Sequence, residues 1–265
     1  IFMGTPNFSV PILKSIHNSQ HEVIGIYTQS PKKKNRGQKI SISPVHEFGL
    51  INKIDVRYPE NLESSEELEF ISSLNPNLIV VVAYGKIIPK KLLNLNKLKF
   101  INVHASLLPK WRGAAPIHRS IMNLDKETGI SIMQITPKLD TGPVLMKKKI
   151  KILKNSNFYD LSKQLSLLGS KMILESLKLI EDGKASFLPQ NENEATYAKK
   201  ISKDEAKIDW KDNAEKIVAK INALHLNPGS WFNLNGSRIK VLKAIEIKAK
   251  GDPGEVLDNN LTIAC

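Results

Sequence analysis

An asparagine and a histidine that flank a single valine are the side chains of this sequence best suited to chemistry at a carbonyl group. Asn102 and His104 accompany the apolar residues Phe100, Ile101 and Val103, which are typical of a buried strand. Because side chains alternate along a strand, both polar groups project from one face at its carboxyl end. An amide can donate a hydrogen bond to a developing oxyanion, and an imidazole can transfer a proton. Such a pair can also be a capped strand end or a satisfied core histidine, so the pair alone leaves both interpretations open.

The segment after this strand is apolar, but it cannot extend the strand. It contains Ser106, Leu107, Leu108 and Pro109. The proline has no backbone N–H for a sheet ladder, and it biases the residue before it toward extended geometry. We therefore expect a fixed loop with an apolar inner surface. Gly113 permits a turn beyond this loop, and a helix is expected from Pro116 through Met122.

The beginning of the chain predicts the fold class. Residues 1–3 are typical of a strand, residues 8–16 carry apolar side chains at helical spacing, and Val23 to Tyr27 predict a second strand. This βαβ order favours an α/β domain with a Rossmann-like, mostly parallel sheet. A dinucleotide-binding fold would show the pattern G-x-G-x-x-G at its first turn, where this chain has only Gly4. We therefore expect the parallel sheet without NAD.

The next strongly apolar run supplies a neighbour for the strand of Asn102. Residues 78–83, LIVVVA, are typical of a strand that is buried on both faces. Ala83, Tyr84 and Gly85 end this strand. The carboxyl ends of neighbouring strands frame the ligand crevice in open α/β sheets, so these residues are predicted to form one wall of a site. Further elements are expected as helices at 64–74 and 157–181 and strands at 130–135 and 144–150.

The domain organisation predicted from the sequence has three parts. Residues 1–189 are expected to form the catalytic domain, and the polar residues 190–200 a linker. Residues 201–265 contain short strand-like runs separated by the turn signals Pro228-Gly229, Asn235-Gly236 and Pro253-Gly254. This pattern favours a small β-barrel of the OB type. Because Cys265 falls inside a strand-like run, we expect that barrel to be incomplete.

Composition and charge narrow the class of protein. The chain has 265 residues, of which 41% are hydrophobic, and it has no apolar run long enough to span a membrane. Its sole cysteine, Cys265, excludes an internal disulfide and a cysteine-rich metal site, which favours a reducing cytoplasm. The formal net charge of +13 suggests a polyanionic partner.

A basic segment between Thr28 and Pro44 is too polar to pack, and we expect a loop there. Its cationic residues are Lys32, Lys33, Lys34, Arg36 and Lys39. Such a loop can bind phosphate groups, but it can equally be an ordinary solvated surface. Composition alone does not decide between these two readings.

The motif around the Asn–His pair resembles a known family. Asn102-x-His104, followed by the loop Ser106 to Pro109 and by Gly113, is similar to the signature of the formyltetrahydrofolate-dependent formyltransferases. The longer string SLLPKWRGAAPI is most similar to members of that family that act on methionyl-tRNA. The string Gly4-Thr5-Pro6-x-Phe8 resembles the start of the same proteins.

The resemblance also suggests a partner for the histidine. Leu139-Asp140-Thr141-Gly142 resembles the formyltransferase loop whose aspartate pairs with the histidine, so Asp140 is expected to approach His104 to within about 10 Å. Asp-Thr-Gly is also the signature of aspartic proteases. Those enzymes need two aspartates that share a proton, and a long α/β chain with one copy of the motif does not fit that requirement.

The resemblance implies an enzyme that transfers the formyl group of 10-formyltetrahydrofolate to the α-amine of initiator methionyl-tRNA. It implies Asn102, His104 and Asp140 as catalytic groups, with no metal. Folate would bind to the loop from Ser106 to Pro109 and to the predicted wall from Ala83 to Gly85. The basic residues would contact the acceptor stem of the tRNA, with Arg36 in the place of the family's key arginine. A monomer in the bacterial cytoplasm, without a membrane partner, is expected.

Alternative functions remain open at this stage. Other enzymes with the same formyl donor act on glycinamide ribonucleotide or on amino sugars, or hydrolyse the donor, and the three catalytic groups do not separate them. The basic loop, the string after Pro109 and the carboxyl-terminal extension favour tRNA as the acceptor. A catalytically silent RNA-binding protein would explain the charge, but it would give no reason for Asn102, His104 and Asp140 together.

Overall fold

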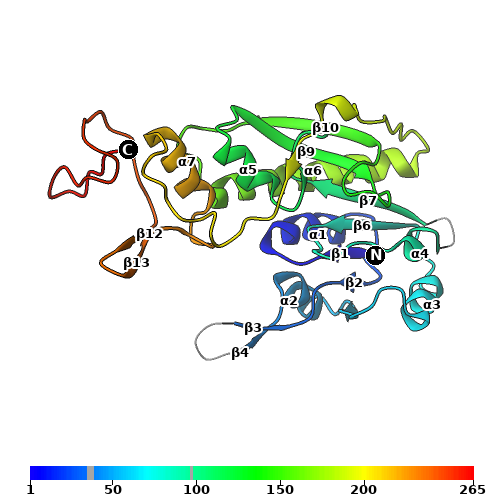
Figure 1. Ribbon diagram of the computed structural model, residues 1–265. Helices are drawn as coiled ribbons and strands as arrows, with labels where there is room; N and C mark the ends of the chain where they lie inside the picture. Colours follow the sequence, from blue (N-terminus) through cyan, green and yellow to red (C-terminus); the bar gives the residue numbers. More distant parts are fainter. Residues whose placement is uncertain (35–38, 96–97) are drawn as a thin grey trace. The chain divides into compact units, whose positions relative to one another are not determined.

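The computed structural model describes residues 1–34, 39–95 and 98–265, and the largest sheet among them has seven strands (Figure 1). The strand order is β10-β9-β7-β6-β1-β2-β5. The strands of this sheet are β1 (Phe2–Gly4), β2 (Ile26–Tyr27), β5 (Val56–Arg57), β6 (Leu78–Val82), β7 (Lys99–His104), β9 (Glu127–Gln134) and β10 (Val144–Lys151). The pairs β5–β2, β2–β1, β1–β6 and β6–β7 are parallel, and β9 runs antiparallel to β7. The predicted Rossmann-like, mostly parallel sheet is confirmed.

The register of the central strands brings their carboxyl ends to one edge. Met3 of β1 pairs with Val81 of β6, and Val81 pairs with Asn102 of β7. The turn after β1, the predicted wall after β6 and the Asn–His pair of β7 therefore follow one another along this edge.

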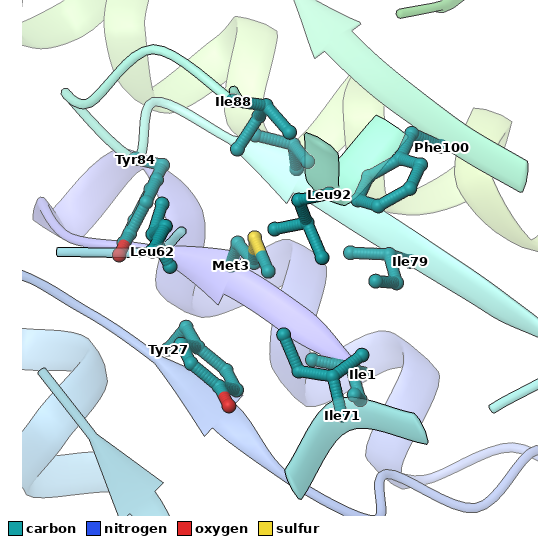
Figure 2. Packing of buried hydrophobic residues seen from close by; sticks show 11 residues of the cluster. Ile1, Met3, Tyr27, Leu62, Ile71, Ile79, Tyr84, Ile88, Leu92 and Phe100 are labelled. Atoms are coloured by element: carbon teal, nitrogen blue, oxygen red, sulfur yellow. The ribbon is translucent and has the colours of Figure 1, made fainter. Parts of the chain in front are cut away.

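One face of the sheet packs against short helices. Ile1 and Met3 from the start of the chain, Ile79 from β6 and Phe100 from β7 gather with apolar side chains from helices (Figure 2). The helices of the chain are α1 (Val10–His17), α2 (Pro44–Ile51), α3 (Ser65–Ser73), α4 (Lys90–Leu93), α5 (Pro116–Met122), α6 (Phe158–Glu181) and α7 (Ala214–Ala223). Within the described residues, none of these combines the length and the apolar composition that crossing a bilayer requires.

Helix α3 begins with only one half of a capping box, the pattern in which an N-cap serine and a glutamate three residues later each bond a backbone N–H of the helix start. The Ser64 side chain accepts a hydrogen bond from the Glu67 backbone N–H at 3.4 Å. The buried Glu67 carboxylate instead accepts from the Tyr27 hydroxyl at 2.9 Å and pairs with Arg57. A buried carboxylate needs hydrogen-bonding or cationic partners. The Glu67 side chain therefore points to Tyr27 and Arg57 and not back to the backbone N–H of Ser64.

The basic segment is not the loop that the sequence predicts. β3 (Lys32–Lys34) and β4 (Lys39–Ser41) pair antiparallel, with Lys32 opposite Ser41 and Lys34 opposite Lys39. A hairpin satisfies backbone groups whatever the polarity of its side chains, which a composition argument does not capture. Residues 35–38, which include Arg36, lie outside the described residues.

The chain forms two compact units, each assembled from separate segments. The first contains Ile1–Arg112, Gly129–Lys148 and Lys163–Thr196, and the second contains Gly113–Thr128, Lys149–Ser162 and Tyr197–Cys265. The three-part division at 189 and 200 remains a prediction.

The carboxyl-terminal residues form a hairpin rather than the predicted barrel. β12 (Ser230–Leu234) and β13 (Ser237–Val241) pair antiparallel around Asn235 and Gly236, so the predicted Asn-Gly turn is confirmed. Ile208, Ile217 and Ile221 form a small core beside this hairpin. A barrel requires every strand to pair on both edges, and in the described part of 201–265 no sheet exceeds two strands. The OB-like barrel is therefore not confirmed.

Among the described residues, the remaining strands are the short β8 (Arg112–Gly113) and β11 (Tyr197–Ala198), which pair with each other.

A half-buried histidine in the second unit, His118, gives a test of that unit's stability. The His118 ring of α5 stacks on Phe158, with 4.1 Å between the ring centroids. Burial, with a smaller contribution from the charge of Arg119, lowers the pKa of His118 from 6.5 to about 4. Between these values the unfolded chain binds a proton that the folded chain does not, so stability falls as the pH falls.

Lowering the pH from about 7 to about 4 is therefore expected to reduce the free energy of unfolding by about 2–3 kcal/mol through His118 alone. His118→Phe keeps the ring stacking and removes the titration, so this variant should lose less stability over the same range. Urea unfolding of both proteins at the two pH values measures the difference. Equal losses would contradict the assignment.

Candidate active site

The Asn–His pair lies at the edge of the sheet that the sequence predicts. His104 is the last residue of β7 and is only 5% exposed, whereas Asn102 is half-buried. In the antiparallel pairing with β9, Asn102 lies opposite Met133 and His104 opposite Ser131. The alternation of the strand therefore places both side chains on one face, as predicted.

The two ring nitrogens of His104 face oxygen atoms. Nε2 lies 2.9 Å from the backbone carbonyl oxygen of Trp111, and Nδ1 lies 3.7 Å from the Asp140 carboxylate. The expected approach of Asp140 to within about 10 Å is thus confirmed. A carbonyl can only accept, so Nε2 carries the hydrogen in the neutral ring and Nδ1 holds the lone pair. A ring with both nitrogens protonated would direct an N–H at each oxygen.

The loop of Asp140 fits closely against the end of β9. Asp140 has a φ of 51°, a left-handed conformation that aspartate tolerates better than most residues. A Cβ atom on Gly142 would lie 1.8 Å from the carbonyl oxygen of Gln134, so only glycine fits there. The Gln134 backbone N–H also donates to the Pro143 carbonyl at 2.9 Å.

Gly142→Ala is expected to displace this loop and to lower kcat by about tenfold or more, because small misplacements of a catalytic group are costly. Gly183→Ala is a matched control, since Gly183 has a φ of 69° but nothing within 4 Å of an added Cβ. That control should lose some stability and keep kcat. Steady-state kinetics together with thermal unfolding of both variants measures this, and an unchanged kcat in Gly142→Ala would contradict the expectation.

The loop after β7 is fixed, as predicted, and most of it faces inward. Ser106, Leu108 and Pro109 are buried, and Leu107 is half-buried. Ser131 of β9 holds the loop, because its hydroxyl accepts from the Leu108 N–H at 3.0 Å and donates to the Ser106 carbonyl at 2.7 Å. The sequence offered no signal for this role of Ser131.

The predicted wall after β6 combines exposed backbone with one buried ring. Ala83 and Gly85 are exposed and have φ values of 46° and 81°. Tyr84 is only 1% exposed and packs in the apolar cluster of Figure 2, and burial raises its pKa to about 12. The Tyr84 carbonyl accepts from the Thr5 hydroxyl at 2.8 Å, which joins this wall to the turn after β1.

A buried arginine near the histidine, Arg112, is not among the site residues predicted from the sequence. Arg112 has a side chain that is 0% exposed, and it donates to Gln190 at 2.9 Å and 3.0 Å and to Glu192 at 2.8 Å. The hydrogen bond from Arg112 holds the pKa of Glu192 below its usual value. Arg112 lies within the string SLLPKWRGAAPI, so the family resemblance could have pointed to it. Gln190 lies in the predicted linker.

The predicted tRNA-binding residues are only partly described. The Lys32 ammonium donates to Gln29 at 2.9 Å on an exposed surface. The side chains of Lys33, Lys34 and Lys39 are not described, and Arg36 lies outside the described residues. Across residues 1–34, 39–95 and 98–265, no cluster of three or more His, Cys, Asp and Glu side chains could hold a metal ion.

Comparison with known families agrees with this fold and motif. The formyl transferase family matches residues 1–177, and the family described as formyl transferase, C-terminal domain, matches residues 200–265. The chain therefore belongs to the formyl transferase family.

Two curated relatives make the comparison more specific. Methionyl-tRNA formyltransferase of Pelagibacter ubique is 52% identical over 266 residues, which cover 100% of this chain and 86% of the relative. Methionyl-tRNA formyltransferase of Paramagnetospirillum magneticum is 44% identical over 266 residues, covering 100% of this chain and 87% of the relative. An N-formyltransferase from Helicobacter canadensis, solved in complex with folinic acid and dTDP-3-aminofucose, has a TM-score of 0.67 at 20% identity. The match covers 91% of this chain and 85% of the Helicobacter chain. At that identity the structural likeness supports the fold alone.

Proposed function

We propose that this chain transfers the formyl group of 10-formyltetrahydrofolate to the α-amine of initiator methionyl-tRNA, giving formylmethionyl-tRNA for translation initiation. Relatives of this activity at 52% and 44% identity over the whole chain support the reaction and both substrates. The observation that carries the residue assignment is the 3.7 Å approach of Asp140 to the His104 ring at the carboxyl edge of the sheet.

The reaction replaces one carbon–nitrogen bond by another. The amine attacks the formyl carbon, a tetrahedral intermediate with a negatively charged oxygen forms, and the bond to the folate nitrogen breaks. The proton lost by the amine ends on that folate nitrogen, so the products are formylmethionyl-tRNA and tetrahydrofolate. An α-amine has a pKa of about 7.7–8.0, so a useful fraction of it is already unprotonated and nucleophilic near neutral pH. The main barrier is therefore the charge that develops on oxygen.

Asn102 stabilises that oxygen in the proposed reaction. Its side chain is half-buried at the strand end, beside the buried His104. A preorganised amide donor of this kind contributes about 3 kcal/mol to the transition state in comparable sites.

His104 moves the proton through Nδ1. The Trp111 carbonyl at 2.9 Å holds the hydrogen of the neutral ring on Nε2, so Nδ1 takes the proton of the attacking amine. The Asp140 carboxylate at 3.7 Å then stabilises the charged ring until the proton passes to the folate nitrogen. In this assignment the Trp111 carbonyl fixes the tautomer of the imidazole, and the Asp140 carboxylate stabilises its protonated form.

The fixed loop and the wall after β6 hold the folate. Buried Ser106, Leu108 and Pro109 give the loop its shape, and half-buried Leu107 contacts the flat pterin. Exposed Ala83 and Gly85, which flank the buried Tyr84, contact the edges of the ring.

The basic segment binds the acceptor. Lys32, Lys33, Lys34, Arg36 and Lys39 neutralise phosphates of the tRNA acceptor stem, which suits the net charge of +13. The enzyme acts as a monomer in the bacterial cytoplasm, where initiator tRNA is charged and used.

Transfer of a labelled formyl group from 10-formyltetrahydrofolate tests the function against its alternatives. The purified chain is assayed with methionyl-tRNA, glycinamide ribonucleotide, an amino-sugar nucleotide and water as acceptors. Labelled formylmethionyl-tRNA is the expected product. Release of free formate, or transfer to a small acceptor without transfer to tRNA, would overturn the proposal.

A further inference from the structure

Gln190 connects the buried arginine to the loop of the catalytic aspartate. Its Nε2 group donates to the backbone carbonyl of Asp140 at 2.9 Å and to that of Gly142 at 2.7 Å. Its Oε1 atom accepts two hydrogen bonds from Arg112, at 3.0 Å and 2.9 Å. One amide side chain thus joins segments that are 50 and 78 residues away in the sequence.

The chemistry of the partners fixes the orientation of this amide. A guanidinium group can only donate, so Oε1 must face Arg112. The amide nitrogen then faces two carbonyl oxygens, which can only accept. Each of the four contacts is therefore matched, and the opposite orientation would leave all four mismatched.

The same chain segment also fixes the other partner of the histidine. The Thr196 hydroxyl accepts from the Trp111 N–H at 2.9 Å, and the Thr196 carbonyl accepts from the Arg112 N–H at 2.9 Å. The Trp111 backbone has a φ of 63°, a conformation that needs support from its surroundings. Residues 190–196 therefore hold the loop on the Nδ1 side of His104 and the carbonyl on its Nε2 side.

We infer that Gln190 is a positioning residue that sets the Asp140 carboxylate against Nδ1 of His104. The inference rests on the proposed function, because it assigns the bonded network to that reaction. Gln190 touches the backbone of Asp140 rather than the ring, so its effect on turnover passes through Asp140.

Two substitutions separate this role from general support. Gln190→Glu still accepts from Arg112 but presents an oxygen to two carbonyl oxygens, and Gln190→Met removes both interactions without adding charge. Gln164→Glu is the matched control, since Gln164 is exposed on α6 in the same unit. Both Gln190 variants should lower kcat by about tenfold, with KM for folate and tRNA changed by less than about twofold. The control should match wild type.

A double-mutant cycle with Asp140→Asn gives the decisive measurement. If Gln190 acts through Asp140, Gln190→Met should change kcat by less than about twofold in the Asp140→Asn background. The same factor in both backgrounds would overturn the inference, as would wild-type kcat in both Gln190 variants or in Asp140→Asn. Thermal unfolding of each variant identifies losses that come from unfolding. If the wild-type enzyme forms no formylmethionyl-tRNA, the proposed function itself is contradicted. That result is obtained from the wild-type protein alone, so it is distinct from any result with the variants.

Discussion

His104→Ala is expected to lower kcat by about 10²–10³ while the folate dissociation constant stays within about twofold of wild type. The imidazole moves a proton only as the transition state forms, so its loss should not weaken ground-state binding. The ring is 5% exposed and contacts Trp111 and Asp140, which are both parts of the site, so the effect on the rest of the fold should be small. Single-turnover kinetics with saturating folate isolates the chemical step.

His21→Ala is a suitable control for this experiment, because His21 is half-buried just after α1 and has no part in the site. Asn102→Ala should give a loss of similar size, about 10²–10³, because its amide is the donor to the developing oxyanion. Wild-type turnover in either variant would remove that residue from the mechanism. A large rise in the folate dissociation constant with unchanged kcat would instead make it a binding residue.

The elements that depend on local pattern were predictable from the sequence. The apolar run of β6 and the alternation of β7 each follow from neighbouring residues, and the structure places β6 at Leu78–Val82 and β7 at Lys99–His104. The same alternation was enough to put Asn102 and His104 on one face. By contrast, the sequence pattern did not indicate the two-residue strand β5, which pairs with β2.

The contacts that complete the site depend on distant segments. Asp140 was expected beside His104 only through the family resemblance, since nothing in its local sequence specifies that partner. Ser131, Arg112 and Gln190 carry no local signal for the hydrogen bonds that they make at separations of 23 to 80 residues. A polar stretch is typical of a linker, and the sequence predicts one at 190–200. The pattern could not indicate the distant partners that Gln190 bonds within that stretch.

The loop predicted between Thr28 and Pro44 was wrong and the predicted barrel was not confirmed, for a related reason. Strand pairing is decided by the partner that is available, so β3 and β4 pair in a segment too polar to predict as a strand. In residues 201–265 the turn signals were correct at Asn235-Gly236, but turn signals do not determine how many strands pair. The barrel therefore required more information than the turns contained.

The affinity for tRNA is expected to fall about 100- to 500-fold between 50 and 200 mM salt, if five cationic side chains each neutralise a phosphate. These side chains are Lys32, Lys33, Lys34, Arg36 and Lys39. Each lost contact should flatten the slope of log affinity against log salt by about 0.7–0.9. A small acceptor such as an amino sugar carries no such array of phosphates and should show no comparable dependence. The salt series therefore tests the acceptor as well as the segment.

Arg36→Ala should weaken tRNA binding more than Lys32→Ala, because a planar guanidinium can make paired hydrogen bonds to a phosphate or a base edge and an ammonium cannot. The same variant should also reduce the discrimination between initiator and elongator methionyl-tRNA, since paired bonds depend on geometry. Lys163→Ala, on an exposed position of α6, is the matched control for the loss of one positive charge. Formylation kinetics of all four proteins on both tRNAs across the salt series gives kcat/KM and its slope. If Arg36→Ala and Lys163→Ala have the same slope and the same discrimination as wild type, the basic segment is a solvated surface, and the tRNA must be bound by another part of the chain.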